Sequence, residues 1–465
     1  MKALLSQIPS VSEILELNAV RELGREFGDG AVKVEMRGLL DEWRRGIRAG
    51  EILCIPAKDE MVDALRQRLV RLTTPQGRAA INAAGILLHT GLGRSPLCAQ
   101  ALEALAGMGT YSVLQTGLAS GKRSLREEKI ERMLIDLTGC EAATIVNNNA
   151  AATMLVLHAL AGGKEVIISR GQLIEIGGEF RMPDVMAQSQ VVMREVGTTN
   201  RTHLHDYERA INENTGALIH VHTSNFRVRG FTGVPDIGRL CALGKARGLP
   251  VIDDIGSGSL IPLSTFGLAD EPLVRASIQA GADVVCFSGD KLIGGPQSGI
   301  ICGKKEIIER IRKNPFARMF RVCKLTVAAL EATLLHFVNG TCTQALPFYQ
   351  MLSVDMTTLN KRAVAMLKVL DGLSGIKAVI TEDVSYVGSG SLPDEGIPTV
   401  VVRVSVDGAM ESRVEKVAEK LRVGMPSVFC RINDDALFFD MRTLFAGEEI
   451  AAASRLREVL GETGS

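Results

Sequence analysis

The chain has 465 residues, of which 46% are hydrophobic and 23% are charged, a composition typical of a folded globular protein and not of a disordered one. Lys plus Arg equals Asp plus Glu at 53 each, so there is no overall positive field, and an RNA partner would need local basic patches. The 9 cysteines stand singly, without a Cys-x-x-Cys pair, so neither a disulfide framework nor a cysteine zinc site is indicated.

The chain shows no targeting or membrane signal. No secretory pattern opens it, and no apolar run approaches the roughly 18 residues that a spanning helix needs. We therefore expect a cytoplasmic protein without a membrane partner.

Residues 1–75 are predicted to form a small helical domain, because apolar residues recur at helical spacing. The arginines of two of these helices share a face, loosely in the second helix. Such faces are usually only solvated, and the alternative is a domain that contacts RNA phosphates. The break Thr73–Gly77 marks the first boundary, so the expected domains are 1–75, 76–335 and 336–465. The arginines concerned are Arg44, Arg45, Arg48, Arg66, Arg68 and Arg71.

Residues 81–97, INAAGILLHTGLGRSPL, form an apolar segment that ends in a glycine turn. This turn exposes His89, Thr90 and Arg94. The pair Gly91-x-Gly93 lacks the third glycine of a dinucleotide fingerprint, so it does not indicate dinucleotide binding.

Three asparagines open a helix directly after a short strand. The strand is Thr144–Val146, and Asn147–Asn149 precede an alanine-rich helix that runs through Leu160. Polar side chains there cap a helix, and the free backbone amides of a helix start also bind phosphate groups. The sequence leaves both interpretations open.

Strands and helices alternate from this point. Glu165–Ser169, Ala217–Val221, Val251–Ile252 and Val284–Phe287 read as apolar strands, and Asp236–Arg247 as a helix between two of them. This order predicts a largely parallel sheet covered by helices, with ligands at the carboxyl ends of the strands. Asp253, Asp254 and Lys291 are expected at that edge.

Lys291 is the strongest candidate for chemistry. It follows the strand Val284–Phe287 and the turn Ser288–Asp290, and Gly294, Gly295 and Gly299 leave no bulk beside it. A primary amine on a long stem forms imines with carbonyl compounds, provided that the site favours its neutral form. A solvated lysine in a glycine turn is the alternative, and the context decides between them.

Two further groups of polar residues are notable. His203 with His205, and His220 with His222, each share a face if the segments are extended, and we expect hydrogen bonding and not metal binding because no ligand cluster is nearby. Residues 306–340 read as helical, with cations at spacings of three on one face. These cations either bind an oxyanion or form an exposed basic face. They are Arg318, Arg321 and Lys324.

After Pro347 a second, smaller α/β unit is expected. Val400–Ser405 alternates as a strand does, and Val428–Ile432 with Leu437–Met441 predicts a hairpin across residues 433–435.

The combination points to pyridoxal 5'-phosphate. A lysine at one strand end attaches the aldehyde, an aspartate at another counters the ring nitrogen, and a helix start holds the phosphate group. The residues expected to hold the cofactor are Lys291, Asp254 or Asp253, Asn148, Asn149 and Ser288.

Nine segments resemble one known family, the bacterial selenocysteine synthases or L-seryl-tRNA(Sec) selenium transferases. The similarity runs from Ile8 to about Leu444. Departures are Gly91, where the family has asparagine, and Ser124-Leu125, where it has glycine-serine. The segments are INAAGILLHTGLGRSPL, SGKRSLR, NNNAAATMLVL, SRGQLIEIGGEFRMPDVM, HTSNFRVRGFTG, DDIGSGSL, SGDKLIGGPQSGIICGKK, NPFARMFRVCK and FFDMRTL.

The resemblance implies a fold-type-I pyridoxal-phosphate enzyme with an N-terminal tRNA-binding domain, assembled as a ring of dimers. It implies that the hydroxyl of serine carried by tRNA(Sec) is eliminated, that a dehydroalanyl intermediate results, and that selenium from selenophosphate is added. Lys291 would attach the cofactor and remove the α proton. Arg94, Arg318 and Arg321 match the positions that bind selenophosphate, and alignment favours Asp254 over Asp253 at the ring nitrogen.

Asp290, next to Lys291, is a further catalytic candidate for proton handling, although turn capping also explains it. Two other functions remain open. One is a lyase or ammonia-lyase on a small amino acid, which the helical domain disfavours because a small substrate needs no such addition. The other is a tRNA-binding relative without catalysis, which would have no lysine-bound cofactor.

Overall fold

The computed structural model describes residues 2–75, 77–269, 271–406 and 411–462. The chain divides into two compact units, 1–79 and 80–465. Among the described residues, none of the helices has the length and apolarity needed to cross a membrane.

The N-terminal unit is entirely helical. Its core is formed by apolar faces of the longer helices, with Leu23, Met36, Leu40 and Leu65 fully buried. Ser10 begins the second helix with a reciprocal capping box to Glu13. The prediction of helices for residues 1–75 is confirmed. Its helices are α1 (Lys2–Leu5), α2 (Val11–Leu15), α3 (Asn18–Phe27), α4 (Asp29–Ala49) and α5 (Lys58–Thr73).

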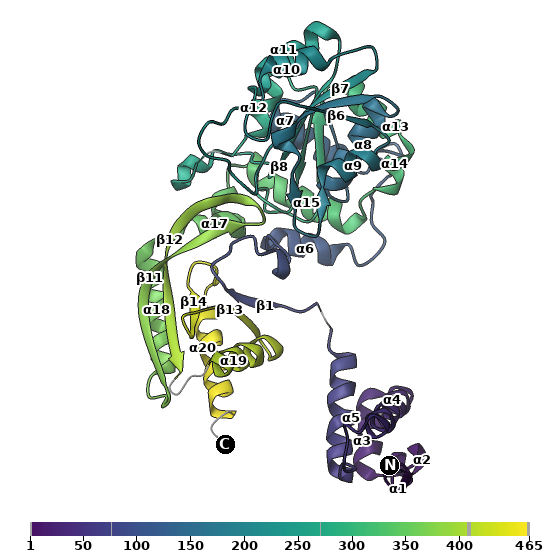
Figure 1. The fold of residues 1–465 in the computed structure, drawn as a ribbon, viewed down its shortest axis with the longest axis vertical. Coiled ribbons are helices and arrows are strands. Elements are labelled where there is room, and N and C mark those ends of the chain that lie inside the picture. The colour runs from purple at the N-terminus through teal and green to yellow at the C-terminus, as the bar shows by residue number, and fades with distance from the viewer. Residues whose placement is uncertain (1, 76, 270, 407–410, 463–465) are drawn as a thin grey trace. The chain divides into compact units, whose positions relative to one another are not determined.

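A seven-stranded sheet forms the centre of the second unit (Figure 1). Its order is β2-β10-β9-β8-β7-β3-β6, and β10 alone runs antiparallel to its neighbours. The largely parallel sheet that the alternation predicted is confirmed, as are the expected strands, apart from a few residues at their ends. The strands are β2 (Ala142–Val146), β3 (Glu165–Ser169), β6 (Val192–Val196), β7 (Thr215–Val221), β8 (Val251–Gly256), β9 (Val284–Ser288) and β10 (Gly299–Gly303).

Helices cover both faces of this sheet, because successive strand residues point to opposite sides and both sides are apolar. One face packs against α8 (Asn149–Ala161), α9 (Met182–Gln188) and α13 (Lys305–Lys313). The other packs against α6 (Ala99–Gly107), α7 (Glu128–Thr138), α10 (Leu204–Ala210), α11 (Ile237–Arg247), α12 (Val274–Gln279) and α15 (Lys324–Val338). A small hairpin, β4 (Glu175–Ile176) with β5 (Phe180–Arg181), precedes α9.

Two expectations about local structure are wrong. The predicted helix over 306–340 is three helices, because Pro315 starts the short α14 (Pro315–Met319) after the Asn314 cap, and α15 begins only at Lys324. Arg318, Arg321 and Lys324 therefore do not line one helical face. His203 and His205 are not on one extended segment, since His203 precedes the first residue of α10.

A five-stranded sheet of order β1-β13-β14-β12-β11 forms the smaller part of this unit. Its apolar face packs against α18, α19 and α20, and the predicted hairpin is β13 with β14. Strand β1 joins it by pairing with β13, so this sheet contains residues outside the expected range 336–465. Its strands are β1 (Ala80–Ala83), β11 (Ile376–Gly388), β12 (Ser391–Val406), β13 (Ser427–Asn433) and β14 (Ala436–Asp440). Its helices are α18 (Met356–Leu370), α19 (Glu411–Val423) and α20 (Glu448–Glu462). The short α16 (Cys342–Ala345) and α17 (Pro347–Ser353) pack instead into the core of the seven-stranded sheet.

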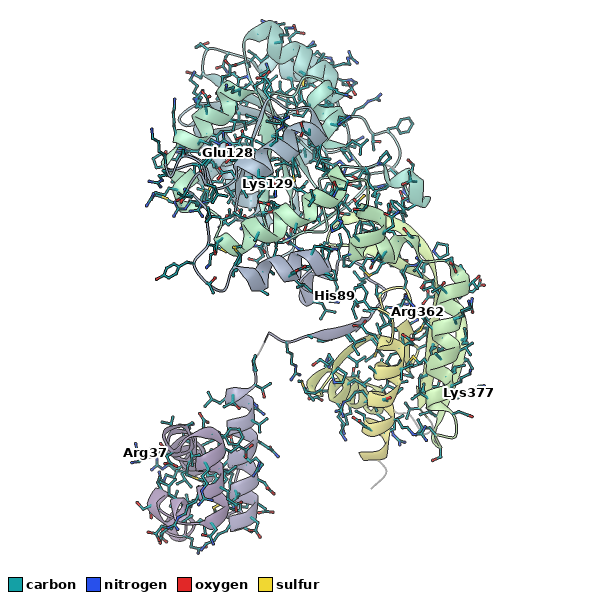
Figure 2. All side chains as sticks on the ribbon, turned by 180° about the vertical axis from the view of Figure 1, so that it is seen from behind. Arg37, His89, Glu128, Lys129, Arg362 and Lys377 are labelled. Carbon is teal, nitrogen blue, oxygen red and sulfur yellow. The ribbon has the colours of Figure 1, made fainter. Side chains whose placement is uncertain are left out.

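Two arginine side chains connect elements of this part of the chain through hydrogen bonds to backbone carbonyl oxygens. Arg362 on α18, labelled in Figure 2, donates to the carbonyl oxygens of Met441 and Leu444. Arg442 is buried, at 3% exposure, and donates to backbone carbonyls of α17, of the residue that follows this helix, and of β12. Its acceptors are the oxygens of Met351 (2.8 Å), Val354 (3.1 Å) and Pro398 (2.5 Å).

We expect Arg442→Met to lower the free energy of unfolding by about 3 kcal/mol, because it leaves several buried carbonyls without a donor. The measurement is the denaturant midpoint followed by circular dichroism. Arg457→Met is the matched control, since Arg457 also donates to carbonyls, those of Val369 and Asp371, but is exposed. Equal losses in the two variants would contradict the assignment.

Candidate active site

Lys291 lies in a tight loop directly after β9. The amide of Gly289 donates to Ser298 O, and the amide of Gly295 donates to Gly289 O, both at 2.9 Å. A Cβ at position 289 would collide with the side chain of Ser298, so only glycine fits there. The loop thus fixes the lysine backbone and leaves the residue 7% exposed.

Asp253 and Asp254 point to opposite sides of the sheet, as neighbours on a strand do. Asp254 accepts hydrogen bonds from Asn149 Nδ2 and Thr153 Oγ1, both at 2.8 Å. Asp253 instead pairs with His220 Nδ1 at 2.8 Å. Burial raises the pKa of Asp254, and the two hydrogen bonds and Lys291 act against that rise.

The asparagines cap helix α8 and also reach the site. Asn148 Oδ1 accepts from the amide of Ala151 at 2.8 Å, which is a normal N-cap. Asn149 donates to Asp254, while its own Oδ1 is buried without a hydrogen-bond partner among the described residues. The start of α8 can therefore be capped and also bind a ligand, because the cap uses Asn148 Oδ1 and leaves Asn149 Oδ1 unpaired among the described residues.

Arg94 and Asp290 form an ion pair beside the lysine loop. Arg94 donates from a terminal nitrogen to Asp290 Oδ2 at 2.7 Å, and the Asp290 side chain is 8% exposed. The Arg94 backbone has a φ of 65°, an uncommon conformation for a residue other than glycine. The preceding segment is held by β11, through Leu87 N to Tyr386 O and Leu88 N to Val387 O.

These residues converge on one cavity of about 250 Å³ at the carboxyl edge of the seven-stranded sheet. Six of the expected site residues line it, and Asp290 contributes through its pair with Arg94. Two lining residues from β4 and β5 are Ile176 and Phe180, and they add an apolar wall. The expected residues in the lining are Arg94, Asn148, Asn149, Asp254, Ser288 and Lys291.

The environment of Lys291 favours its neutral amine. Burial lowers the pKa of this lysine, the charge of Arg94 lowers it further, and Asp290 and Asp254 act in the opposite direction. A neutral amine is the form that attacks a carbonyl. The sequence indicated this requirement but not how it is met.

Three expected residues lie elsewhere. Arg318 and Arg321 are not in the lining of the Lys291 cavity as far as the described residues show, although Phe320 O between them accepts from Asn147 N at 2.9 Å. Asp253 faces His220 and, among the described residues, does not belong to that lining either.

Several lining or supporting residues were not expected. Thr153 stands four residues after Asn149, so both side chains lie on one face of α8, and this spacing could have predicted a second donor to Asp254. His222 directly follows β7 at the same edge, which strand order alone also indicated. Ser224 and Gln297 lie in loops, for which the sequence offered no signal.

Comparison with known proteins assigns the family. Residues 80–445 match the model described as L-seryl-tRNA selenium transferase, and residues 5–44 match the one described as selenocysteine synthase N terminal. The chain belongs to the L-seryl-tRNA selenium transferase family. The resemblance inferred from the nine sequence segments is thereby confirmed.

Relatives with the same description cover almost the whole chain. An L-seryl-tRNA(Sec) selenium transferase of Carboxydothermus hydrogenoformans is 41% identical over 460 residues, covering 98% of each chain. One of Clostridium perfringens is 42% identical over 464 residues, covering 98% of this chain and 99% of its own. Among solved structures, D-glucosaminate-6-phosphate ammonia-lyase is similar in fold, with a TM-score of 0.57 and 22% identity over 83% of this chain and 97% of that one. The fold is that of the fold-type-I pyridoxal-phosphate enzymes.

The cofactor of this family member is pyridoxal 5'-phosphate. The residues of the cavity fit it. Lys291 offers an amine with a lowered pKa, and the buried Asp254 has a raised pKa that a cationic ring nitrogen opposite it would lower. The buried Asn149 Oδ1 has no partner among the described residues, so it can accept a hydrogen bond from a ligand or an ordered water.

Replacing Arg94 should move the pH dependence of cofactor attachment. Arg94→Met removes a cation that lowers the pKa of Lys291 and also frees Asp290, so this pKa should rise. A higher pKa means that the neutral amine is reached only at higher pH. We expect the midpoint of the attachment rate of added pyridoxal phosphate, followed by absorbance against pH, to shift upward.

Arg170→Met serves as the control for the Arg94 variant. Arg170 follows β3 at the same edge of the sheet but pairs with Glu195 outside the cavity. Its midpoint should equal that of the parent. A downward shift in the Arg94 variant, or the same shift in both, would refute this account.

Proposed function

We propose that this chain converts L-seryl-tRNA(Sec) into L-selenocysteinyl-tRNA(Sec) with selenophosphate as the selenium donor. The observation that carries the proposal is one cavity in which a buried amine, a buried carboxylate and a cation face the same space. Membership of the L-seryl-tRNA selenium transferase family supplies the substrate class.

Lys291, Asp254 and the start of α8 are proposed to hold the cofactor. Lys291 attaches it covalently, Asp254 faces its ring nitrogen, and Ser288 with the region of Asn148 and Asn149 holds its phosphate group. When bound, pyridoxal phosphate supplies an electron-poor ring that withdraws electrons from the substrate Cα. The released Lys291 amine then takes the α proton, for which its lowered pKa suits it.

Arg94 is proposed to bind the oxyanion of selenophosphate, together with Arg318 and Arg321. These last two do not line the cavity among the described residues but flank Phe320, whose carbonyl oxygen accepts from Asn147 N next to the start of α8. An arginine presents paired donors that match such an oxyanion. We assign Asp290 the role of orienting Arg94, because their 2.7 Å ion pair occupies one carboxylate oxygen. In this proposal, orientation of Arg94 takes the place of direct proton handling by Asp290.

A direct assay tests the function. Purified protein is incubated with seryl-tRNA(Sec) and selenophosphate, and the esterified amino acid is released and identified by mass spectrometry. We expect selenocysteine only when both substrates are present. Turnover of free serine with no change in seryl-tRNA would overturn the proposal and favour the lyase.

The N-terminal unit is proposed to bind the tRNA. Arg45 and Arg48 on α4 are exposed, whereas Arg44 pairs with Asp41 at 2.7 Å. We expect Arg45→Ala with Arg48→Ala to weaken binding and to reduce the slope of log affinity against log salt by about 2, as for two lost phosphate contacts. Filter binding across a salt series measures this.

Arg44→Ala is the matched control, because its guanidinium is already paired. It should leave the salt slope nearly unchanged. If the double variant keeps the parent slope, these arginines do not contact phosphates.

The assembly and the compartment complete the proposal. We propose a homo-oligomer, a ring of dimers and by resemblance a decamer, that works in the cytoplasm. Light scattering coupled to size exclusion gives the subunit count. A monomer that retains full activity would contradict the oligomer.

A further inference from the structure

His222 lies at the end of β7, where no role has been assigned to it. Its amide donates to Asp254 O at 2.9 Å, so its backbone is fixed beside the aspartate of the site. Its side chain is 25% exposed and lines the Lys291 cavity. The same residue also borders a neighbouring cavity of about 220 Å³ at the ends of β3, β6 and β7.

A buried carboxylate holds one nitrogen of this ring. His222 Nε2 lies 3.1 Å from Glu271 Oε2, and Ser257 Oγ donates to the same oxygen at 2.7 Å. The side chain of Glu271 is 3% exposed, and Ser257 is fully buried. The three residues form a continuous hydrogen-bonded row from the interior of the sheet edge to the cavity.

Glu271 is ionised in this row. Burial acts to raise its pKa, but the hydrogen bond and charge of His222 and the hydrogen bond of Ser257 outweigh burial and lower it. The carboxylate lies 3.1 Å from Nε2 and accepts a hydrogen bond from that nitrogen, which fixes the orientation of the ring.

The other ring nitrogen, Nδ1, is free for a ligand. Within the described part of the chain it has no hydrogen-bond partner, and it is not among the buried polar atoms without one. The row Ser257–Glu271–His222 thus ends in a ring that lines the Lys291 cavity and has one nitrogen not engaged by Glu271.

Elimination of a hydroxyl needs such a donor, because hydroxide is a poor leaving group unless it is protonated. Among the described residues that line the cavity, the other titratable groups have other tasks. Arg94 does not release its proton, Asp254 is engaged by Asn149 and Thr153, and Lys291 takes the α proton in the proposed function. His222 is left.

We propose that His222 donates from Nδ1 the proton that leaves with the substrate β-oxygen, and that Glu271 and Ser257 are its positioning residues. The inference rests on the proposed function. The Cβ–O bond breaks with its electron pair on oxygen, the imidazolium proton converts that oxygen to water, and the electrons of the Cα–H bond form the new carbon–carbon double bond. Neutral His222 then regains a proton from solvent.

The test compares two leaving groups. His222→Gln keeps an amide near the position of Nε2 for Glu271 but offers no acid. Its elimination rate on seryl-tRNA(Sec) should fall roughly 10²- to 10⁴-fold. On tRNA carrying β-chloroalanine the rate should stay near that of the parent, because chloride leaves without a proton.

The cofactor spectrum and a second variant guard against trivial explanations. The absorbance of the bound cofactor should be unchanged in His222→Gln, and Glu271→Gln should show a smaller loss with the same dependence on the leaving group. His205→Gln, an exposed histidine on α10, should behave as the parent on both substrates. An altered cofactor spectrum would instead make His222 a cofactor ligand and overturn the proposal.

The result separates this inference from the proposed function. If the parent protein does not act on seryl-tRNA(Sec), the function itself fails. If the parent acts and His222→Gln is equally impaired on both leaving groups, or not impaired at all, the function stands and the role of His222 falls.

Discussion

Lys291→Ala should abolish selenocysteinyl-tRNA formation, with a rate loss of at least roughly 10⁴-fold, the upper end of what one acid–base group contributes. Lys291 is asked both to attach the cofactor and to move the α proton, so its removal takes away two functions at once. The cofactor should then bind without covalent attachment. Borohydride should no longer fix it to the chain, which absorbance and intact mass measure.

Two variants sharpen this prediction. Lys291→Arg keeps a cation in the 7% exposed position but not a nucleophilic amine, so it should fail as Lys291→Ala does. Lys313→Ala, on the exposed side of α13, should keep both activity and covalent attachment. Persistent borohydride labelling in Lys291→Ala would show that another amine carries the cofactor.

The sheet and its ligand edge could be predicted because local and long-range signals agree there. Val284–Phe287 and Ala217–Val221 are almost wholly apolar, as strands buried on both faces must be, and parallel strands bring their carboxyl ends to one edge. Asp254, Lys291 and the start of α8 therefore met where they were expected. No tertiary information was needed for that part of the site.

The pairing of side chains could not be predicted, because it depends on loops and on contacts distant in sequence. Arg94 and Asp290 are 196 residues apart, and their ion pair follows from the attachment of the Arg94 segment to β11. Glu271 reaches His222 from a loop 49 residues away. Hydrophobic periodicity carries no signal for either contact.

The resemblance identified segments without distinguishing their tasks. FFDMRTL contains Asp440 and Arg442, which are buried hydrogen-bonding centres of the small sheet and lie outside the Lys291 cavity. Gly91, a departure from the family, stands beside His89, whose buried Nδ1 has no partner among the described residues. A Cβ at position 91 would lie 3.3 Å from Cε1 and 3.5 Å from Nδ1 of that ring, so the side chain that the family has there would contact His89, a consequence visible only in the structure.

Asp254→Asn should slow the reaction roughly 10²- to 10⁴-fold, the effect of losing about 3–5 kcal/mol from one partner of a buried ion pair. The variant should still fold, because Asn149 can rotate its amide so that its Oδ1, which lacks a partner among the described residues, accepts from the new side chain. The measurement is the turnover number on seryl-tRNA(Sec), with the cofactor spectrum as a check on binding.

Asp253→Asn is the decisive comparison, because the sequence alone left the two neighbours open. The amide of this variant would keep an acceptor for His220, outside the cavity, so the loss should stay below about tenfold, the weight of one neutral hydrogen bond. The ratio between the variants tests which carboxylate faces the ring nitrogen. If Asp253→Asn causes the larger loss of activity, Asp253 and not Asp254 faces the ring nitrogen, and the geometry assigned to Asp254 must be given up.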